Sequence, residues 1–458
     1  MEFKTIIEPF RIKSVEPIRM TTSAERAHYL REAHYNPFLL PSDKVLIDLL
    51  TDSGTSAMSS RQWAAMMLGD ESYAGAKSWE RFFAQINDLT GMPHILPTHQ
   101  GRAAERILYG HLGGKGKFFF SNTHFDTTRA NIEFSGGTAI DLPCPEAMHY
   151  DSPVPFKGNM DTKKLEEQIR AVGAPQVAAV ILTVTNNSGG GQPVSMANAR
   201  EVAGICKQFQ VPFVLDCCRI AENAYFVRHN EPACAHLSYR EIARQMFDLA
   251  DAAVMSIKKD GLVNMGGFLA LRDHALSDAC TNLLIITEGF ATYGGLSGRD
   301  MEAIAVGLEE VFEADYLHYR IRSTAYLGER IRSRGVPVLF PIGGHAVYVD
   351  SRGLYPHIPP HEFPGQALVC DLYEVGGIRS VEVGSVMFGK YAPDGAFIPA
   401  QQELVRLALP RRVYTQSHLD FVIEVFEEIV RRREAARGFR IVYEPPFLRH
   451  FTAHFERL

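Results

Sequence analysis

The sequence is poor in cysteine, lacks a long apolar run and carries no excess of positive charge. Its 458 residues include seven cysteines, which is an odd number and too few for a disulfide framework in a chain of this length. The longest apolar run, residues 177–184, falls well short of the roughly 20 residues that span a bilayer. The first residues, MEFKTIIEPFRIKS, lack the apolar stretch of a signal peptide. We therefore expect a soluble, cytoplasmic protein.

The charge balance and the missing motifs exclude several classes of ligand. Lysine and arginine total 47 against 53 aspartates and glutamates, a net charge of -6, which argues against nucleic acid or an anionic membrane as the main partner. No Walker motif is present, and no G-x-G-x-x-G opens a helix after a strand. The glycine run at residues 188–192 is more simply a turn whose glycines adopt positive φ. Small molecules or proteins remain as the classes of ligand that the sequence allows.

What the sequence does contain is an average globular composition, with 46% hydrophobic and 22% charged residues. At roughly 150 residues per domain, this length allows about three domains or two large ones. Residues 177–185 and 211–216 are apolar and rich in β-branched residues, which predicts two buried strands. Helices are predicted between them, over residues 197–209, and before them, over residues 161–173. This alternation predicts a parallel sheet covered on both faces.

The texture of the sequence changes from about residue 311 onward, where long helical patterns dominate. One of these helices opens at Ser417. Residues 343–350 and 404–410 are strand-like. Together these segments predict a smaller α+β domain in the last third of the chain.

Polar residues follow three of the predicted strands. They are Asn187 after residues 177–185, Asp216 and Arg219 at the end of residues 211–216, and Ser256, Lys258 and Lys259 after the apolar residues 252–255. Ligands bind outside the carboxyl ends of the strands in an open α/β sheet. These strand ends are therefore the first candidates for a functional site.

The lysine pair suggests a particular cofactor, although two adjacent lysines on their own are more often a solvated pair. A lysine amine can form a Schiff base with an aldehyde cofactor. Pyridoxal 5′-phosphate also needs a carboxylate at its ring nitrogen, and small residues with backbone N–H groups around its phosphate. Asp216 supplies the carboxylate, and Ser256 with the segment Thr98-His99-Gln100-Gly101-Arg102 supplies a phosphate site.

Ten segments spread over nearly the whole chain resemble the pyridoxal-phosphate-dependent β-eliminating lyases, the family of the tryptophanases and tyrosine phenol-lyases. They are EPFRIKSVEP, FLLPSDKVLIDLLTDSGT, GDESYAG, PTHQGR, GGGQPVSMAN, AENAYF, KKDGLVNMGGF, TYGGLSGRDMEA, FPGQAL and PRRVYTQSHLD. The sequence departs from the family pattern at two places. Ala103 replaces a glycine that is usual in the family, and Cys217-Cys218 replace small or hydroxyl residues.

The resemblance implies an α/β fold of the aspartate-aminotransferase-like type, fold type I. It implies an N-terminal arm with part of the small domain over residues 1–55, a large PLP-binding domain with a parallel sheet over residues 56–310, and a small α+β domain over residues 311–458. It also implies a homotetramer, a dimer of dimers with active sites at the subunit interface.

The resemblance also implies roles for individual residues. In the cofactor site, Lys259 forms the Schiff base, Asp216 pairs with the ring nitrogen, Asn187 and Arg219 hold the phenolic oxygen, Phe125 stacks on the ring, and Gln100, Gly101, Arg102 and Ser256 bind the phosphate. Lys258 serves a neighbouring polar network. Arg411 clamps the substrate carboxylate with Thr51 and Ser53 near it, and Gly54, Glu71 and Asn264 sit in the motifs that bind potassium. Tyr73 is the acid that reaches in from the neighbouring subunit.

Three positions distinguish the activities within the family. Tyrosine phenol-lyases resemble one another in having threonine at the position of Asp126, arginine at that of Val383 and phenylalanine at that of His450. Val383 cannot donate to a phenolate, whereas Asp126 can accept from an indole N–H and His450 can serve as a polar partner. A site built around one polar group rejects analogues lacking it by roughly 10⁴-fold.

The resemblance therefore implies β-elimination of L-tryptophan to indole, pyruvate and ammonium. Alternatives within the enzymes are a tyrosine phenol-lyase or a lyase for another β-substituted amino acid, such as cysteine or serine. Outside them stand a nucleotide-binding protein that uses the glycine run, and a scaffold that keeps an inactive pyridoxal fold. The combination of Lys259, Asp216 and Arg411 argues against the last two.

Overall fold

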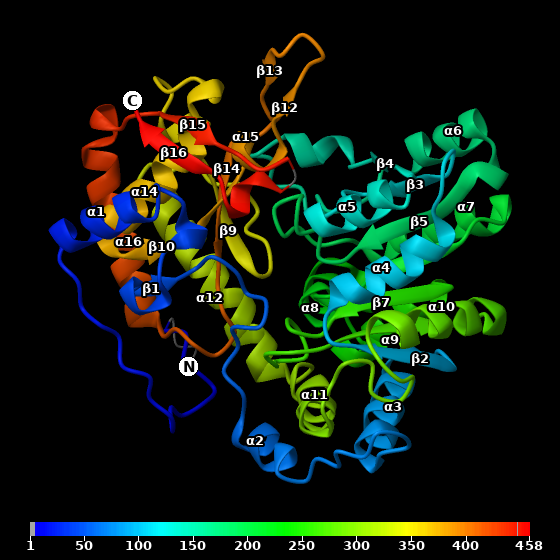
Figure 1. Cartoon of the computed structure of the whole chain (residues 1–458). Helices are drawn as coiled ribbons and strands as arrows, with labels where there is room; N and C mark the ends of the chain where they lie inside the picture. Colours follow the sequence, from blue (N-terminus) through cyan, green and yellow to red (C-terminus); the bar gives the residue numbers. More distant parts are fainter. Residues whose placement is uncertain (1–4, 447) are drawn as a thin grey trace. The chain divides into compact units, whose positions relative to one another are not determined.

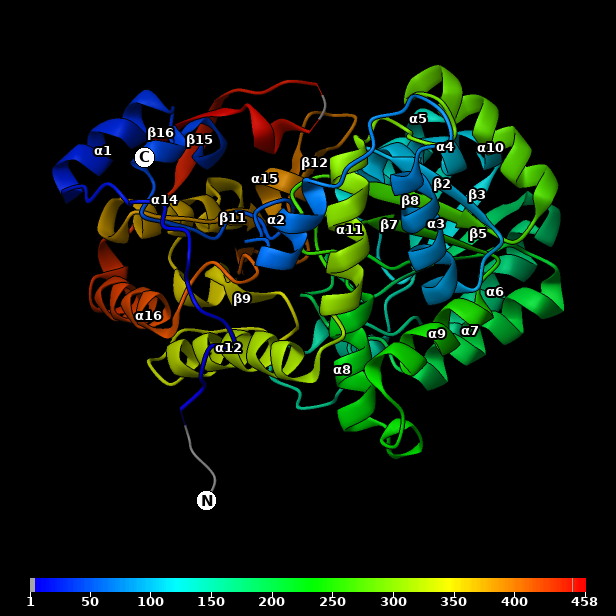
Figure 2. The same cartoon turned by 90° about the horizontal axis from the view of Figure 1, so that it is seen from below.

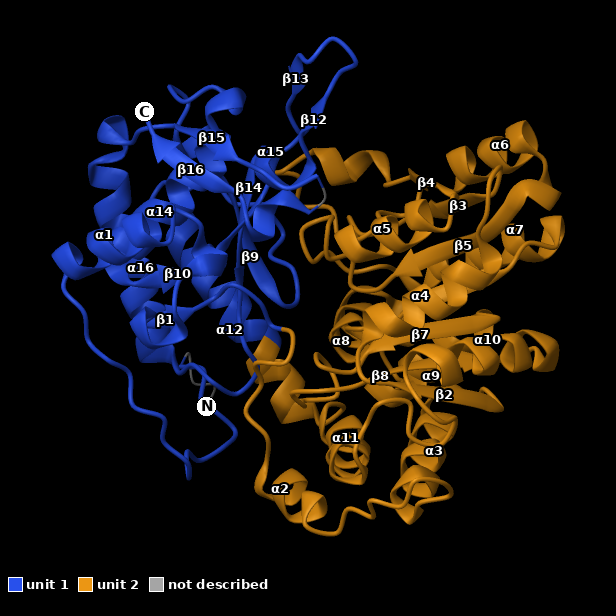
Figure 3. Cartoon of the chain, viewed as in Figure 1, with its two compact units in different colours: residues 1–52, 321–458 blue, residues 53–320 orange. Residues whose placement is uncertain are grey.

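The structure, a computed structural model, describes residues 5–446 and 448–458. The chain divides into two compact units, coloured separately in Figure 3. Unit 1 comprises residues 1–52 and 321–458, and unit 2 comprises residues 53–320. The sequence prediction places its domain boundaries after residues 55 and 310, and residues 1–4 of its first segment lie outside the described residues. Helix α12 (Ala314–Arg332) runs from unit 2 into unit 1.

Unit 2 is built on a seven-stranded sheet with the strand order β2-β8-β7-β6-β5-β3-β4 (Figure 1). The strands are β2 (His94–Thr98), β3 (Phe118–Ser121), β4 (Thr138–Asp141), β5 (Val177–Thr183), β6 (Phe213–Asp216), β7 (Ala252–Ser256) and β8 (Gly267–Leu271). Every residue of β5, β6, β7 and β8 is buried. Continuous burial is typical of strands covered on both faces, as the apolar runs predict.

The predicted parallel sheet is confirmed, and one strand that the sequence analysis did not predict, β8, runs antiparallel within it. Strands β3, β4, β5, β6 and β7 pair in parallel, whereas β8 pairs antiparallel with both β7 and β2. A parallel pair needs a crossover connection of a dozen or more residues, usually a helix. Only residues 257–266 join β7 to β8, so this connection turns the chain straight back.

Helices cover the two faces of this sheet (Figures 1 and 2). The helices of unit 2 are α2 (Ser60–Met66), α3 (Lys77–Thr90), α4 (Gly101–Leu112), α5 (Asp126–Phe134), α6 (Thr162–Val172), α7 (Met196–Phe209), α8 (Ile220–Asn230), α9 (Tyr239–Leu249), α10 (His274–Thr287) and α11 (Gly298–Glu310). Buried residues of α4, α5 and α10 form one apolar core with the sheet, while α6, α7 and α9 lie on its other side (Figure 2).

The helices predicted before and between the two central strands are present and correctly capped. Helix α6 begins after Asp161, whose side chain accepts from Lys164 N, and it ends at Gly173. Helix α7 begins after Ser195, whose side chain accepts from Asn198 N. Such caps satisfy amides that have no partner inside the helix. The glycine run is a turn in which Gly190 and Gly191 adopt positive φ, as predicted.

Unit 1 contains the two ends of the chain and a three-stranded antiparallel sheet of order β11-β14-β9. Its helices are α1 (Ser23–Glu32), α13 (Ser351–Leu354), α14 (Pro364–Gly376), α15 (Ser385–Phe388) and α16 (Gln416–Arg431). Its strands are β1 (Ile47–Asp48), β9 (Ala346–Asp350), β10 (Ile378–Arg379), β11 (Val381–Val383), β12 (Lys390–Tyr391), β13 (Phe397–Ile398), β14 (Leu404–Ala408), β15 (Phe439–Tyr443) and β16 (His454–Arg457). One apolar core contains residues of α14, α16, β9 and β14.

Among the residues that the structure describes, no helix is long and apolar enough to cross a membrane.

Candidate active site

The polar residues predicted at three strand ends lie together at one edge of the unit 2 sheet. Asp216, the last residue of β6, pairs in register with Thr183 of β5 and with Val254 of β7. Asn187 follows β5 by four residues, and Ser256 is the last residue of β7. Because these strands are parallel neighbours, their carboxyl ends share the edge where ligands bind in such folds.

Asp216 is a buried carboxylate that Cys218, two residues later in the chain, contacts directly. The Cys218 thiol donates to Asp216 Oδ1 over 3.0 Å, and Cys218 Sγ accepts from Ser256 N over 3.2 Å. Thr183 Oγ1 donates to the second carboxylate oxygen over 3.4 Å. Burial, followed by the negative charge of Asp216, raises the pKa of Cys218 far above its usual value. The thiol therefore stays protonated and serves as a hydrogen-bond donor. It is not a nucleophile in this state, because only the thiolate is nucleophilic.

The start of helix α4 forms a cradle against the end of β7. A Cβ on Gly101 would lie 2.5 Å from Ser256 Cβ and 2.8 Å from Ser256 N, so only glycine allows this approach. Gln100, the N-cap, makes no side-chain capping bond to the helix. The first amides of a helix and its dipole favour an anion. The cradle therefore fits the phosphate of pyridoxal phosphate, with the exposed Arg102 beside it.

Lys259 lies on the turn after β7, which a neighbouring carboxylate fixes. Asp260 is fully buried and accepts from Ala221 N over 2.7 Å, so it caps helix α8 while anchoring the lysine turn. Lys258 Nζ donates to Gln100 Oε1 over 3.4 Å. Burial, and then the positive charges of Lys259 and Arg102, lowers the pKa of Lys258 to about 8.

Glu105, one turn into α4, is a buried carboxyl group that the sequence did not reveal. It accepts from Thr127 Oγ1 over 3.2 Å and from Thr128 Oγ1 over 2.5 Å, both on the first turn of α5. Burial, followed by the negative charge of Asp216, raises the pKa of Glu105 to about 7. Glu105 therefore ties α4, which begins at the phosphate cradle, to the helix that carries Phe125 and Asp126 at its start.

The remaining residues that the sequence analysis predicts for the cofactor flank the same sheet edge. Phe125 is the N-cap of α5 and directly precedes Asp126. Ser188 Oγ, next to Asn187, donates to the carbonyl of His124 over 3.1 Å, which links the glycine turn to the Phe125 segment. The buried Arg219 is the N-cap of α8, and its amide donates to Val184 O over 3.2 Å.

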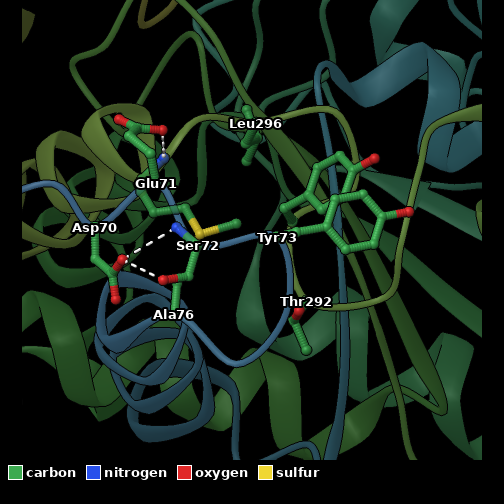
Figure 4. Close-up of a pocket in the computed structure, with 10 residues that line it drawn as sticks. Asp70, Glu71, Ser72, Tyr73, Ala76, Thr292 and Leu296 are labelled. Atoms are coloured by element: carbon green, nitrogen blue, oxygen red, sulfur yellow. Dashed lines mark hydrogen bonds between the residues drawn. The ribbon is translucent and has the colours of Figure 1, made fainter.

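Tyr73 lines a cavity of about 200 Å³ together with Glu71, Thr292 and Leu296 (Figure 4). Its side chain is on the surface, 69% exposed, and its ring lies 5.2 Å from that of Tyr293. The hydrogen bond with Tyr293 raises the pKa of Tyr73 still further above neutral pH. The Tyr73 hydroxyl therefore keeps its proton at neutral pH. Figure 4 shows the Glu71 carboxylate turned away from Tyr73, and this carboxylate accepts from Gly298 N at the start of α11 over 3.0 Å.

Two of the three residues assigned to potassium contact each other. Asn264 Nδ2 donates to Gly54 O over 2.9 Å and to Ser56 O over 3.2 Å. A Cβ on Gly54 would lie 3.0 Å from Asn264 O, so the two main-chain segments touch. Glu71 instead caps α11. Within residues 5–446 and 448–458, no three His, Cys, Asp or Glu residues form a group that could hold a metal ion.

In unit 1, Arg411 forms a buried ion pair with a residue that the sequence reasoning passed over. Arg411 is 0% exposed and Asp52 is 1% exposed. Arg411 Nη1 donates to Asp52 Oδ2 over 2.9 Å and to Asp52 O over 3.3 Å. Asp52 therefore holds one nitrogen of the guanidinium in place. Thr51, its neighbour in the chain, belongs to unit 1, whereas Ser53 is the first residue of unit 2.

Val383 and His450, the other two residues of unit 1 that are predicted to recognise the substrate, are both buried. Val383 ends strand β11, and His450 lies in a 3₁₀ turn (Arg449–Phe451). Two buried carboxyls, Glu382 and Glu403, stand beside Val383. A Cβ on Gly384, the residue after Val383, would lie 2.7 Å from a carboxyl oxygen of Glu382 and 2.7 Å from one of Glu403. Burial, and then the neighbouring Glu403, raises the pKa of Glu382 to about 8.

This raised pKa predicts a pH dependence of stability. The folded protein keeps a proton on Glu382 that the unfolded chain has released above pH ~4.3, the usual glutamate value. The contribution is therefore complete below that pH and is lost as the pH rises through about 8. The expected slope is about 1 kcal/mol per pH unit. Urea unfolding of the wild type and of Glu382→Gln between pH 5.5 and 8.5 measures it.

We expect Glu382→Gln to lose less stability than the wild type over this range, because the amide does not titrate. Glu424→Gln, an exposed change on α16, serves as the matched control and leaves the slope unchanged. Equal slopes for the wild type and Glu382→Gln would contradict the assignment of the proton to this residue.

Comparisons with known proteins identify the relatives of the chain. A family model described as beta-eliminating lyase matches residues 48–425. A tryptophanase of Salinibacter ruber is 58% identical over 450 residues, 98% of this chain and 95% of the relative. A tyrosine phenol-lyase of Symbiobacterium thermophilum is 47% identical over 449 residues, 98% of each chain. The serine palmitoyltransferase structure of Sphingomonas wittichii aligns with a TM-score of 0.59 at 12% identity, over 90% of this chain and 97% of that one. This likeness confirms the predicted fold class.

Proposed function

The chain belongs to the β-eliminating lyase family, and we propose that it is a carbon–carbon lyase that cleaves L-tryptophan to indole, pyruvate and ammonium. The observation that carries the choice of substrate is the higher identity to a tryptophanase than to a tyrosine phenol-lyase, each over almost the whole chain. The apolar Val383, which offers no donor to a phenol oxygen, supports the same choice.

The proposed cofactor is pyridoxal 5′-phosphate, and the residues at the sheet edge suit it. Lys259 would hold it covalently, the buried Asp216 would pair with its ring nitrogen, and the cradle of Gly101 and Ser256 would take its phosphate. Asn187, Arg219 and Phe125 would complete its surroundings. When bound, the cofactor withdraws electrons from the substrate Cα and so makes the α-proton acidic.

The chain's own residues would then bind the substrate and move its protons. Arg411, oriented by Asp52, would bind the α-carboxylate, because a planar guanidinium matches a carboxylate with two parallel bonds. The Lys259 amine would take the proton from the substrate Cα. Tyr73, whose hydroxyl stays protonated, would deliver a proton to indole C3.

Protonation of indole C3 is needed because an aryl carbanion is a poor leaving group. Asp126 would accept from the indole N–H, and His450 would act as a polar partner in the same recognition. The exposure of the Tyr73 side chain supports a role toward a neighbouring subunit. The homotetramer, the potassium ion with Gly54, Glu71 and Asn264 as its ligands, and the cytoplasmic location are parts of the same proposal.

A substrate panel tests the proposed function. The purified wild-type protein, supplied with pyridoxal phosphate and potassium, is expected to release indole from L-tryptophan with a kcat/KM at least about 100-fold above that for phenol release from L-tyrosine, because Val383 offers no donor to the phenol oxygen. Indole, phenol and pyruvate are measured separately. Faster phenol release would establish the tyrosine activity instead, and pyruvate formed only from cysteine or serine would establish a lyase for small β-substituted amino acids.

A further inference from the structure

Helix α15 is only four residues long and directly follows the segment that carries Val383. Polar side chains hold both of its ends. At its start, Glu382 accepts from Val386 N over 3.0 Å and from Met387 N over 3.1 Å. Glu403 accepts from Ser385 N over 3.2 Å and also from the Ser385 hydroxyl. Since Glu382 and Val383 are consecutive in β11, their side chains point to opposite faces of the strand. The two carboxyl groups thus fix the turn, and the Glu382 side chain does not occupy the face of Val383.

At the other end of α15, one arginine donates to three main-chain carbonyls. Arg449 Nη2 donates to Ser385 O and to Gly389 O, each over 2.7 Å, and Arg449 Nε donates to Val386 O over 2.7 Å. A cation at the carboxyl end matches the direction of the helix dipole. A helix this short cannot be stable by itself, so its position depends on these contacts.

Arg449 has further partners that hold its guanidinium in place. Its Nη1 donates to Glu444 Oε2 over 3.1 Å. Its guanidinium carbon lies 5.7 Å from the ring centre of Tyr391 and 5.5 Å from that of Phe397, both on the β12–β13 hairpin. Only 11% of the side chain is exposed. A partly buried arginine with this many partners has a single geometry, in contrast to a solvated surface charge.

The next residue in the chain is His450, which is held from its other side. Asn36 Nδ2 donates to His450 O over 3.2 Å and to Ala453 O over 2.8 Å, and the ring of Phe38 lies 5.8 Å from the His450 ring, edge to face. The position of His450 relative to α15 is therefore set by Arg449, and the position of α15 relative to Val383 is set by Glu382 and Glu403.

We propose that Arg449 is a positioning residue for substrate specificity, which holds Val383 and His450 in one fixed arrangement around the aromatic ring of the substrate. This inference rests on the proposed function of these two residues. Arg449 acts through them and does not itself contact the substrate. Its loss should therefore impair cleavage of an aromatic side chain far more than elimination of a small leaving group.

The test compares two substrates in Arg449→Met, which keeps a long apolar side chain but removes every donor. For L-tryptophan we expect kcat/KM to fall about 30-fold, mainly through kcat, because a misplaced ring is poorly oriented for protonation. The leaving group of S-methyl-L-cysteine departs as methanethiol, so this substrate needs no ring protonation. For it we expect less than about a 3-fold change in kcat/KM. Arg449→Lys should recover only part of the loss, since an ammonium cannot reproduce the planar fork.

Arg440→Met is the matched control, because Arg440 lies in the same C-terminal segment but forms a mostly exposed pair with Glu456. It should leave both substrates unchanged. Equal losses for the two substrates in Arg449→Met would show a general structural role and overturn the proposal, as would unchanged tryptophan cleavage. If Arg449→Met does not fold, Arg449→Lys tests the proposal in its place, by the same comparison of its losses for L-tryptophan and for S-methyl-L-cysteine. A wild type that releases no indole would refute the proposed function alone, and the contrast would then be measured with L-tyrosine.

Discussion

Lys259→Ala is expected to lower kcat for indole release by at least about 10⁴-fold, the scale of losing a group that acts in the transition state. The reason is that one amine is assigned two tasks, holding the cofactor and taking the α-proton. The structure gives the side chain a fixed origin, because Asp260 caps α8 and anchors the turn on which Lys259 lies. Pyruvate and indole production by the variant and the wild type measures the effect.

A second readout identifies the attachment site independently of activity. Borohydride reduction of the wild type is expected to fix the cofactor on the peptide that contains Lys259, as mass spectrometry would show. Lys259→Ala should yield no such adduct, although it should still bind pyridoxal phosphate, because Asp216 and the Gly101 cradle remain.

Lys258→Ala is the matched control for this experiment. Lys258 contacts Gln100, and its pKa, lowered to about 8, reflects burial and two positive neighbours. We expect this variant to keep the covalent adduct at Lys259. An adduct on Lys258 in the wild type, or indole release that survives in Lys259→Ala, would reverse the assignment of the two lysines.

The elements around this site were predictable because each has a local signal. Buried parallel strands are continuous apolar runs, so residues 177–185 and 211–216 were recognisable, and their polar ends marked the functional edge of the sheet. The direction of β8 was not predictable in this way. It depends on the short connection after β7, and the apolar residues of β8 read the same in either direction.

The partners of the functional residues were harder to predict than the residues themselves. Glu105 lies on the buried face of α4 with Ala104 and Leu108, and a glutamate on an apolar face is the signal that was available in the sequence. Asp52 gave no comparable signal, because its pairing with Arg411 joins positions that are far apart in the chain. The roles of Asp126 and His450 came from the family resemblance, since no local pattern distinguishes them from ordinary polar residues.

The ion pair of Arg411 and Asp52 leads to the second large prediction. Arg411→Met is expected to lower kcat/KM for L-tryptophan by about 10³-fold, because a buried carboxylate clamp is lost and the substrate carboxylate is left without its partner. It should also destabilise unit 1 by about 3–5 kcal/mol, since the buried Asp52 loses the guanidinium with which it pairs. Steady-state kinetics and urea unfolding measure the two effects separately.

A double variant separates these two effects. In Arg411→Met combined with Asp52→Asn, neither side chain is charged, so most of the lost stability should return, because replacing both members of a buried pair is often nearly neutral. Activity should stay low, because no guanidinium remains to bind the substrate. Arg412→Gln, a change at the next residue, which is only half-buried, is the control and should keep most of the activity. If the double variant regained activity together with stability, Arg411 would have a structural role only, and the carboxylate clamp would have to be sought elsewhere.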